Sequence, residues 1–158
     1  MPSPIRLNPV GSIQIKGSHH YVTIKQKYRK ALKELEGFSH IHIIWWANHS
    51  DAPGLRDNLM VTHPYQKGPD SVGIFATRSE IRPNPILITT AVATRIDLGK
   101  GIIEVPWIDA ENGSPVIDIK PYHPCLDRVK DVRLPIWCSE WPRWYKDSAT
   151  FDWNAVFN

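Results

Sequence analysis

The chain has 158 residues, which suits one domain of ordinary size and leaves little room for two. Hydrophobic residues make up 42% and charged residues 22%, a balance that excludes a wholly disordered chain. The 19 Lys and Arg against 16 Asp and Glu leave a net charge of +3, which permits an anionic partner without requiring one.

The sequence also lacks the marks of a membrane or disulfide-stapled protein. No run approaches the ~18 apolar residues of a membrane span, and the first residues, MPSPIRLNPVG, contain no apolar stretch of signal-peptide length. Cys125 and Cys138 form no C-x-x-C pair, so no disulfide framework and no cysteine zinc site is indicated. We therefore expect a cytoplasmic protein with no membrane span.

The first part of the chain predicts two strands, a helix and a buried strand. Residues 13–15 and 21–24 alternate apolar and polar side chains, as short strands do. Residues 28–36 (YRKALKELE) predict a helix, with Gly37 placed to end it. Residues 38–47 (FSHIHIIWWA) are apolar and rich in strand-forming residues, which favours a strand buried on at least one face.

The rest of the chain predicts further strands and an irregular tail. Residues 48–70 hold three Pro and two Gly, which is typical of a long excursion. Strands are expected again at 72–77, 86–96, 101–108 and 116–119. After Pro121 the chain is rich in Pro and Trp, with Trp137, Trp141 and Trp144 at roughly helical spacing.

These elements predict a mainly β fold with one or two short helices. Many short strands at close spacing favour a closed or nearly closed β-barrel over a sandwich. We expect one barrel-like domain over 1–158, with a core at about 8–124. The Trp-rich tail, 125–158, should pack on the barrel or on a dimer partner.

A first polar cluster, SVGIFATRSEIRPNP, occupies residues 71–85. Pro83 and Pro85 restrict the backbone around them, so the preceding polar loop should be rigid. Arg78 and Arg82 are permanently charged and suit the recognition of a carboxylate or phosphate. The plainer alternative is that one Arg pairs with a nearby acid while the prolines shape a turn.

A second polar cluster, WIDAENGSPVIDIKPY, occupies residues 107–122. A hairpin turn at Asn112-Gly113 is the plain reading. That reading explains less well why Asp109 and Glu111 follow a buried strand, where an acidic group needs a partner.

Histidines and lysines leave two further questions open. His40 and His42 share one face of a strand, but no third ligand has a matching spacing, so we expect packed, hydrogen-bonded strand histidines and no metal. His49 follows the buried strand directly and could face a pocket. Around the predicted helix five cations form either a solvated face or a patch that meets RNA phosphates: Lys25, Lys27, Arg29, Lys30 and Lys33.

The segments GIFATRSEIRPNPI and DAENGSPVIDIKPY together resemble the TsaA-like (TrmO) family. The family patterns run G-x-F-A-T-R-S-P-x-R-P-N-P-I-G and D-x-x-D-G-T-P-V-x-D-I-K-P-Y. The order and spacing match, and the upstream LEGFSHIHIIWW is similar as well, so the resemblance covers roughly residues 10–124.

The resemblance implies a homodimeric, single-domain protein that binds S-adenosylmethionine (SAM). The chemistry it implies is methylation of N6 of N6-threonylcarbamoyladenosine in tRNA, next to the anticodon. Carried over by motif, the cofactor-binding residues are Asn48, His49, Arg78, Ile88, Asp109, Ala110, Glu111 and Asn112.

The chain departs from the family pattern at several positions. Glu80 replaces a Pro, Leu87 a Gly and Asn112 an Asp, and residues 19–27 lack the family's Pro-Arg-Gln-like segment. Since the sulfonium is already activated, alignment could supply much of the rate; if a general base is needed, Asp118 and His49 are the candidates. Methylation of a small molecule, or a non-catalytic SAM- or nucleotide-binding module, are the alternatives.

Overall fold

A computed structural model describes residues 4–158 and divides the chain into two compact units. The first unit holds the residues up to 52 together with 84–128. The second unit holds 53–83 together with 129–158, so most of the Pro- and Gly-containing segment 48–70 and most of the Trp-rich tail belong to the same unit. The expected single domain over 1–158 stays a prediction.

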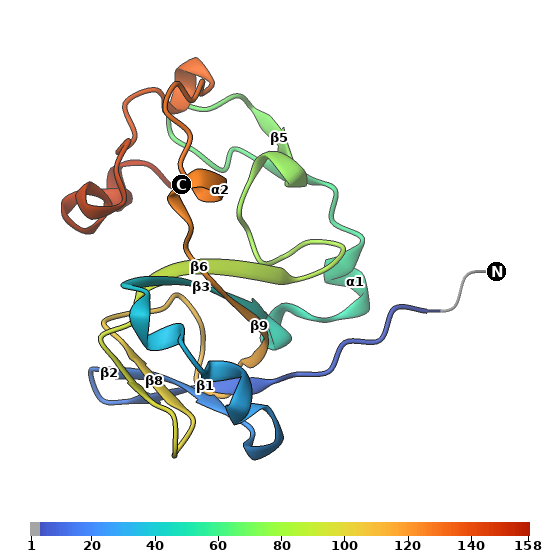
Figure 1. The fold of residues 1–158 in the computed structure, drawn as a ribbon. Coiled ribbons are helices and arrows are strands. Elements are labelled where there is room, and N and C mark those ends of the chain that lie inside the picture. The colour runs from blue at the N-terminus through green and yellow to red at the C-terminus, as the bar shows by residue number, and fades with distance from the viewer. Residues whose placement is uncertain (1–3) are drawn as a thin grey trace. The chain divides into compact units, whose positions relative to one another are not determined.

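The first unit is built on one antiparallel sheet of seven strands (Figure 1). Their order is β6-β3-β9-β1-β2-β8-β7, so the two edges are formed by strands that follow one another along the chain. The bounds are β1 (Gly11–Lys16), β2 (His19–Ile24), β3 (His40–Trp46), β6 (Ile86–Val92), β7 (Arg95–Asp97), β8 (Ile102–Val105) and β9 (Pro115–Pro121). The mainly β prediction is confirmed. Within residues 4–158 no pairing joins β6 to β7, so barrel closure is not confirmed.

The sheet curls around one hydrophobic core. In β3 the side chains alternate, and Ile41, Ile43 and Trp45 are buried. Residues from five other strands meet these three in one cluster: Ile13, Val22, Ile24, Ala91, Ile103, Val105 and Val116. Since side chains from both ends of the strand order share one core, the sheet must curl strongly about it.

The helix predicted at 28–36 is wrong in type. The structure has a 3-10 helix η1 (Gln26–Leu32) and a short second one, η2 (Leu35–Gly37). Glu34 between them has a φ of 69°, which interrupts the helical backbone. No side chain caps the start of η1, and its first turn carries no acid, so little favours a longer α-helix there.

Two segments that were each predicted as one continuous strand are divided in the structure. Residues 72–77 form β5 (Ser71–Gly73) followed by a 3-10 turn, η4 (Ile74–Ala76). Residues 86–96 divide into β6 and β7. The segments 101–108 and 116–119 correspond to β8 and β9.

The second unit joins the excursion to the tail through aromatic side chains. Strand β4 (Met60–Thr62), which the sequence did not predict, pairs with β5 after the short helix α1 (Pro53–Arg56). Tyr65 stacks on Trp137 at 4.7 Å and meets Trp141 edge-on at 5.3 Å between ring centroids. Trp144 is 61% exposed, so the helical spacing of the three Trp does not make one buried face.

Short helical turns make up much of the rest of the tail. They are η5 (Ile136–Cys138), η6 (Tyr145–Thr150) and η7 (Trp153–Ala155). The first residues of the predicted tail instead form α2 (Pro124–Asp127) in the first unit. Packing of the remaining tail on the barrel or on a partner stays a prediction.

Candidate functional site

Asn48 and His49 lie in a tight turn at the end of β3. They form the 3-10 turn η3 (Asn48–Ser50), and both are exposed. Trp46 Nε1 donates to Asp51 Oδ2 at 2.8 Å across this turn. The backbone N–H of Ala47 donates to the carbonyl of Pro85 at 2.9 Å, so the end of the RPNP segment is tied to the start of the turn.

The acidic turn after β8 meets this end of β3. Ile108 is buried and anchors the turn, while Asp109 and Glu111 are exposed. Glu111 Oε2 lies 3.4 Å from His49 Nε2. The structure therefore brings together two of the segments that the motifs assign to cofactor binding.

The other half of the same turn has a structural role. Asn112 Oδ1 accepts the N–H of Ile15 at 2.8 Å, and the Gly113 N–H donates to the carbonyl of Ile13 at 2.8 Å. Gly113 has a φ of 90°, a conformation that favours glycine. The Asn-Gly hairpin thus explains residues 112 and 113, but it does not explain the exposed Asp109 or the contact of Glu111 with His49.

Ile88 and Asp118 lie on one face of the sheet, on either side of β3. Both pair with Ile44, and residues directly opposite one another in antiparallel strands point to the same face. Ile88 is 44% exposed there. Lys120 Nζ lies 2.8 Å from Asp118 Oδ2, and this hydrogen bond raises the pKa of the Lys120 ammonium.

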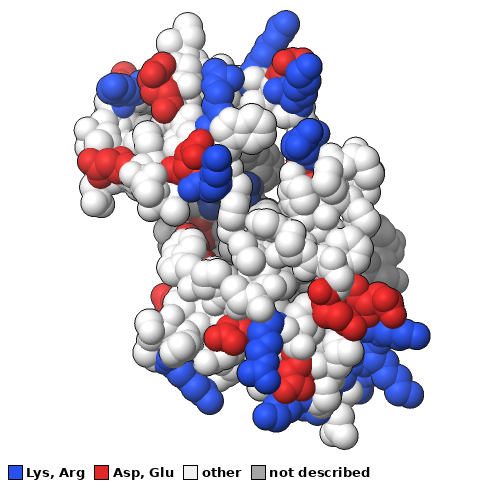
Figure 2. All heavy atoms as spheres, turned by 60° about the vertical axis from the view of Figure 1, so that its left-hand side comes forward, with Lys and Arg blue, Asp and Glu red and all other residues white. Residues whose placement is uncertain are grey.

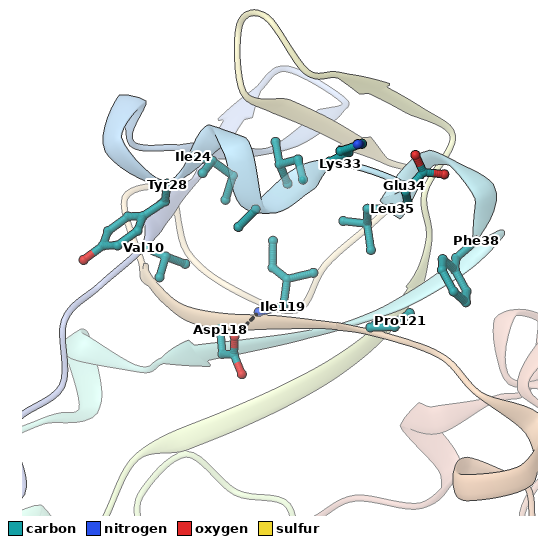
Figure 3. A pocket seen from close by; sticks show the side chains of 12 residues that line it. Val10, Ile24, Tyr28, Lys33, Glu34, Leu35, Phe38, Asp118, Ile119 and Pro121 are labelled. Atoms are coloured by element: carbon teal, nitrogen blue, oxygen red, sulfur yellow. Dashed lines mark hydrogen bonds between the residues drawn. The ribbon is translucent and has the colours of Figure 1, made fainter.

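An apolar groove of about 270 Å³ lies between η1, η2 and β9 (Figure 3). Tyr28, Leu35 and Ile119 are among its lining residues, and the Asp118 carboxylate lies on the opposite side of β9 from the Ile119 side chain. None of the predicted cofactor-binding residues lines the groove. It is therefore separate from the turn formed by His49 and Glu111.

Arg78 lies in the second unit, in a loop that its neighbours hold in place. Ser79 N–H donates to Thr77 Oγ1 at 3.3 Å, and Ile81 N–H donates to Ser79 Oγ at 3.2 Å. Arg82 Nη1 reaches the carbonyls of Thr77 and Ser79, at 3.4 and 3.3 Å. Arg82 thus bonds the loop backbone on both sides of Arg78, a role that the sequence did not reveal.

Sequence reasoning expected hydrogen-bonded histidines in this strand but did not name the partners of His42. Its Nδ1 lies 2.9 Å from Thr90 Oγ1, and its Nε2 lies 3.2 Å from Asp127 Oδ1. The pKa of Asp127 is lowered, chiefly because its carboxylate accepts the His123 backbone N–H and also because it meets His42. The alternation of β3 could have placed His42 beside a β6 residue, but nothing in the sequence indicated Asp127.

Neither a metal centre nor a membrane helix is found in the described part of the chain. Among residues 4–158, no three His, Cys, Asp or Glu side chains form a group that could hold a metal ion. Over the same residues, no helix is both long enough and apolar enough to cross a membrane.

Comparison with known proteins identifies the family. The model of the tRNA-methyltransferase O N-terminal domain matches residues 3–128. The chain belongs to this family. The match includes β1 to β9, both polar clusters and α2, and it confirms the predicted resemblance.

Proteins similar to this chain are named either as S-adenosyl-L-methionine-binding proteins or as methyltransferases. The S-adenosyl-L-methionine-binding protein of Archaeoglobus fulgidus is 35% identical over 111 residues, which are 70% of this chain and 74% of that protein. A probable S-adenosyl-L-methionine-binding protein of Pyrococcus horikoshii is 36% identical, over 80% of this chain and 88% of its own length. The tRNA (adenine(37)-N6)-methyltransferase of Escherichia coli is 35% identical over 65% of this chain, and the matched part is 43% of that enzyme.

A solved structure has the same fold. The crystal structure of TrmO from P. aeruginosa superposes with a TM-score of 0.65 and 25% sequence identity. The match covers 86% of this chain and 62% of that one. The chain therefore spans less than two thirds of this neighbour and less than half of the E. coli enzyme.

Proposed function

We propose that the protein is a SAM-dependent methyltransferase that modifies N6 of N6-threonylcarbamoyladenosine in tRNA, next to the anticodon. The observation that carries this proposal is the family match over residues 3–128. The names of the archaeal relatives support the cofactor, and the name of the E. coli relative supports transfer to an adenine of tRNA.

The residues proposed to bind the cofactor are Asn48, His49, Arg78, Ile88, Asp109, Ala110, Glu111 and Asn112. The residue types suit SAM, which carries a ribose diol, an amino acid group and an adenine. Carboxylates such as Glu111 accept hydrogen bonds from a diol, a guanidinium such as Arg78 can pair with the carboxylate, and exposed Ile88 offers apolar surface to the base. When bound, SAM supplies an activated methyl group.

The chain's own contribution is to orient the acceptor nitrogen and, if required, to take its proton. His49 is one candidate base, because Glu111 at 3.4 Å would stabilise the imidazolium that forms. Asp118 is the other, since it shares a face of the sheet with Ile88 and is an acceptor-only carboxylate paired with Lys120. Both assignments are part of the proposal.

A SAM-binding module without turnover is the second candidate, favoured by the names of the archaeal relatives. Incubating the protein with methyl-labelled SAM, in parallel with total tRNA and with a small-metabolite extract, separates the possibilities. Label in tRNA supports the proposed function, whereas label only in a small molecule identifies the other kind of methyltransferase. SAM binding without transfer to either would support the binding module.

The proposal includes a homodimer in the cytoplasm, built on a barrel-like sheet. Support for the dimer comes from the tail, where Ile136 is 93% and Trp144 61% exposed. Large apolar side chains of this kind are enriched in interface cores. A cytoplasmic location would suit a tRNA substrate and a chain whose two cysteines are both free.

A further inference from the structure

We propose that a row of three lysines on η1, made of Lys27, Lys30 and Lys33, binds the phosphates of an RNA strand. This inference rests on the proposed function in one respect, because it takes the RNA to be the tRNA substrate. The sequence had left these lysines as either a solvated face or an RNA-facing patch.

The 3-10 conformation is what lines the three lysines up. A 3-10 helix has three residues per turn and a rise of about 2 Å per residue, so side chains at every third position eclipse at intervals of ~6 Å. Lys27 and Lys30 lie within η1 and Lys33 is its C-terminal cap, and all three are exposed. In an α-helix the same three side chains would be offset by about 60° at each step and would not form one straight row.

The other two cations of the segment are engaged in the fold. Lys25 Nζ donates to the carbonyl of Pro9 at 2.7 Å, and Arg29 Nη1 donates to the carbonyl of Gly99 at 2.8 Å. Arg29 Nε is buried as well. Lys25 and Arg29 therefore hold η1 in place through hydrogen bonds to the backbone. The other three cations, Lys27, Lys30 and Lys33, form the row.

The three ammonium groups of the row are not held in ion pairs within the described part of the chain. Lys27 Nζ lies 4.7 Å above the Tyr28 ring. Among residues 4–158, no carboxylate forms an ion pair with any of the three ammonium groups. In Figure 2, Lys and Arg side chains lie at the lower right of one face and directly adjoin Asp and Glu side chains. Ammonium groups that no ion pair holds are available to the phosphates of a polyanion.

The surroundings of the row favour RNA over a protein or a membrane. Protein interfaces need an apolar centre that a partner can cover. The apolar side chains next to the row line the groove between η1, η2 and β9, and those contributed by residues 8–54 are not among the exposed large apolar side chains described between residues 4 and 158. A membrane-bound helix needs an outward apolar face, but Leu32 of η1 is only 4% exposed and belongs to the core. Lysine ammonium groups bind phosphates as point charges without either feature.

The test compares two triple variants of the full chain that lose the same charge. The first is K27Q/K30Q/K33Q, and the control is K16Q/K67Q/K146Q, whose lysines are also exposed and lie elsewhere. Fluorescence anisotropy measures binding of labelled total tRNA from low to high salt. We expect the row variant to bind at least ~10-fold more weakly at 0.1 M salt, with a slope of log K against log salt smaller by about 2, since each lost phosphate contact removes roughly 0.7.

The control should keep most of its affinity, and both variants should keep the thermal unfolding temperature and SAM affinity of the unmodified protein. If the triple variant unfolds, Lys30→Gln alone should lower the slope by about 0.7. Equal tRNA binding by the row variant and the control would overturn the inference. Row-dependent binding to phosphatidylserine vesicles without binding to tRNA would overturn it too.

The outcomes distinguish this inference from the proposed function. If the unmodified protein methylates tRNA but the two variants bind tRNA equally, the lysine row is not the RNA-binding surface and the proposed function stands. Row-dependent tRNA binding without methyl transfer to tRNA keeps the row and rejects the function.

Discussion

Arg78 is the residue whose loss should affect cofactor binding most. Arg82 Nη1 bonds the loop backbone on both sides of Arg78, and the loop should keep these bonds in Arg78→Ala. A charge-assisted contact to a carboxylate contributes about 1.5–3 kcal/mol, so SAM affinity should fall more than ~10-fold. Calorimetry with Arg133→Ala, another exposed arginine, as the control would measure this; equal affinity of the two variants would exclude Arg78 from the site.

Asp127 makes a pH-dependent contribution to stability. Its pKa is lowered in the folded chain by the His123 N–H and by His42, so its stabilising effect is complete above the unfolded pKa of about 3.9. That effect is lost as the pH falls through the lower folded pKa. Thermal unfolding of Asp127→Asn should therefore show a lower Tm than the unmodified chain at pH 7, with the difference closing below about pH 4.

Asp131→Asn provides the matched control, because Asp131 is an exposed carboxylate in the second unit. It should unfold like the unmodified chain at every pH. A Tm difference for Asp127→Asn that persists unchanged at pH 3 would show that the carboxylate charge is not what stabilises the contact with His42 and the His123 N–H.

Among the elements, the turn between β7 and β8 is the most sensitive to a small change. Gly101 has a φ of 69°, and a Cβ there would lie 2.7 Å from Arg29 Nε and 2.9 Å from the carbonyl of Ile24. Gly101→Ala should therefore destabilise the fold by roughly 1–3 kcal/mol and loosen η1. Gly99→Ala in the same turn meets nothing nearer than 3.6 Å and is the control. Equal urea midpoints for the two variants would contradict this prediction.

The element types that depend on local alternation were predictable, and those that depend on distant contacts were not. The buried positions of β3 follow directly from its sequence, HIHIIWW. The helix at 28–36 went wrong because the left-handed Glu34 breaks the segment. Strand β4 was not predicted because three residues are too few to show an alternation of apolar and polar side chains. The strand is recognised by its pairing with β5.

The same limit applies to the candidate site. Its residues could be assigned only by resemblance to family motifs, since no composition or spacing pointed to SAM. The contact between His49 and Glu111 joins residues from two loops, and the contact between His42 and Asp127 joins β3 to α2. Contacts between such distant segments depend on the sheet order, which the sequence did not indicate.

At the scale of the whole molecule, we predict association into a dimer. The exposed Ile136 and Trp144 of the tail would be covered by a second copy, as large apolar side chains in interface cores are. Light scattering at micromolar concentration should give twice the chain mass of 18.1 kDa, and Trp144→Lys should shift it towards the monomer. A single chain mass for the unmodified protein would contradict the prediction.

The central claim is that the protein transfers the methyl group of SAM to an adenosine of tRNA. Mass spectrometry of nucleosides from tRNA incubated with protein and SAM tests it most directly. We predict that N6-threonylcarbamoyladenosine gains one methyl group with the unmodified protein, and gains far less with Arg78→Ala. Unchanged N6-threonylcarbamoyladenosine after incubation with protein that binds SAM would contradict the claim.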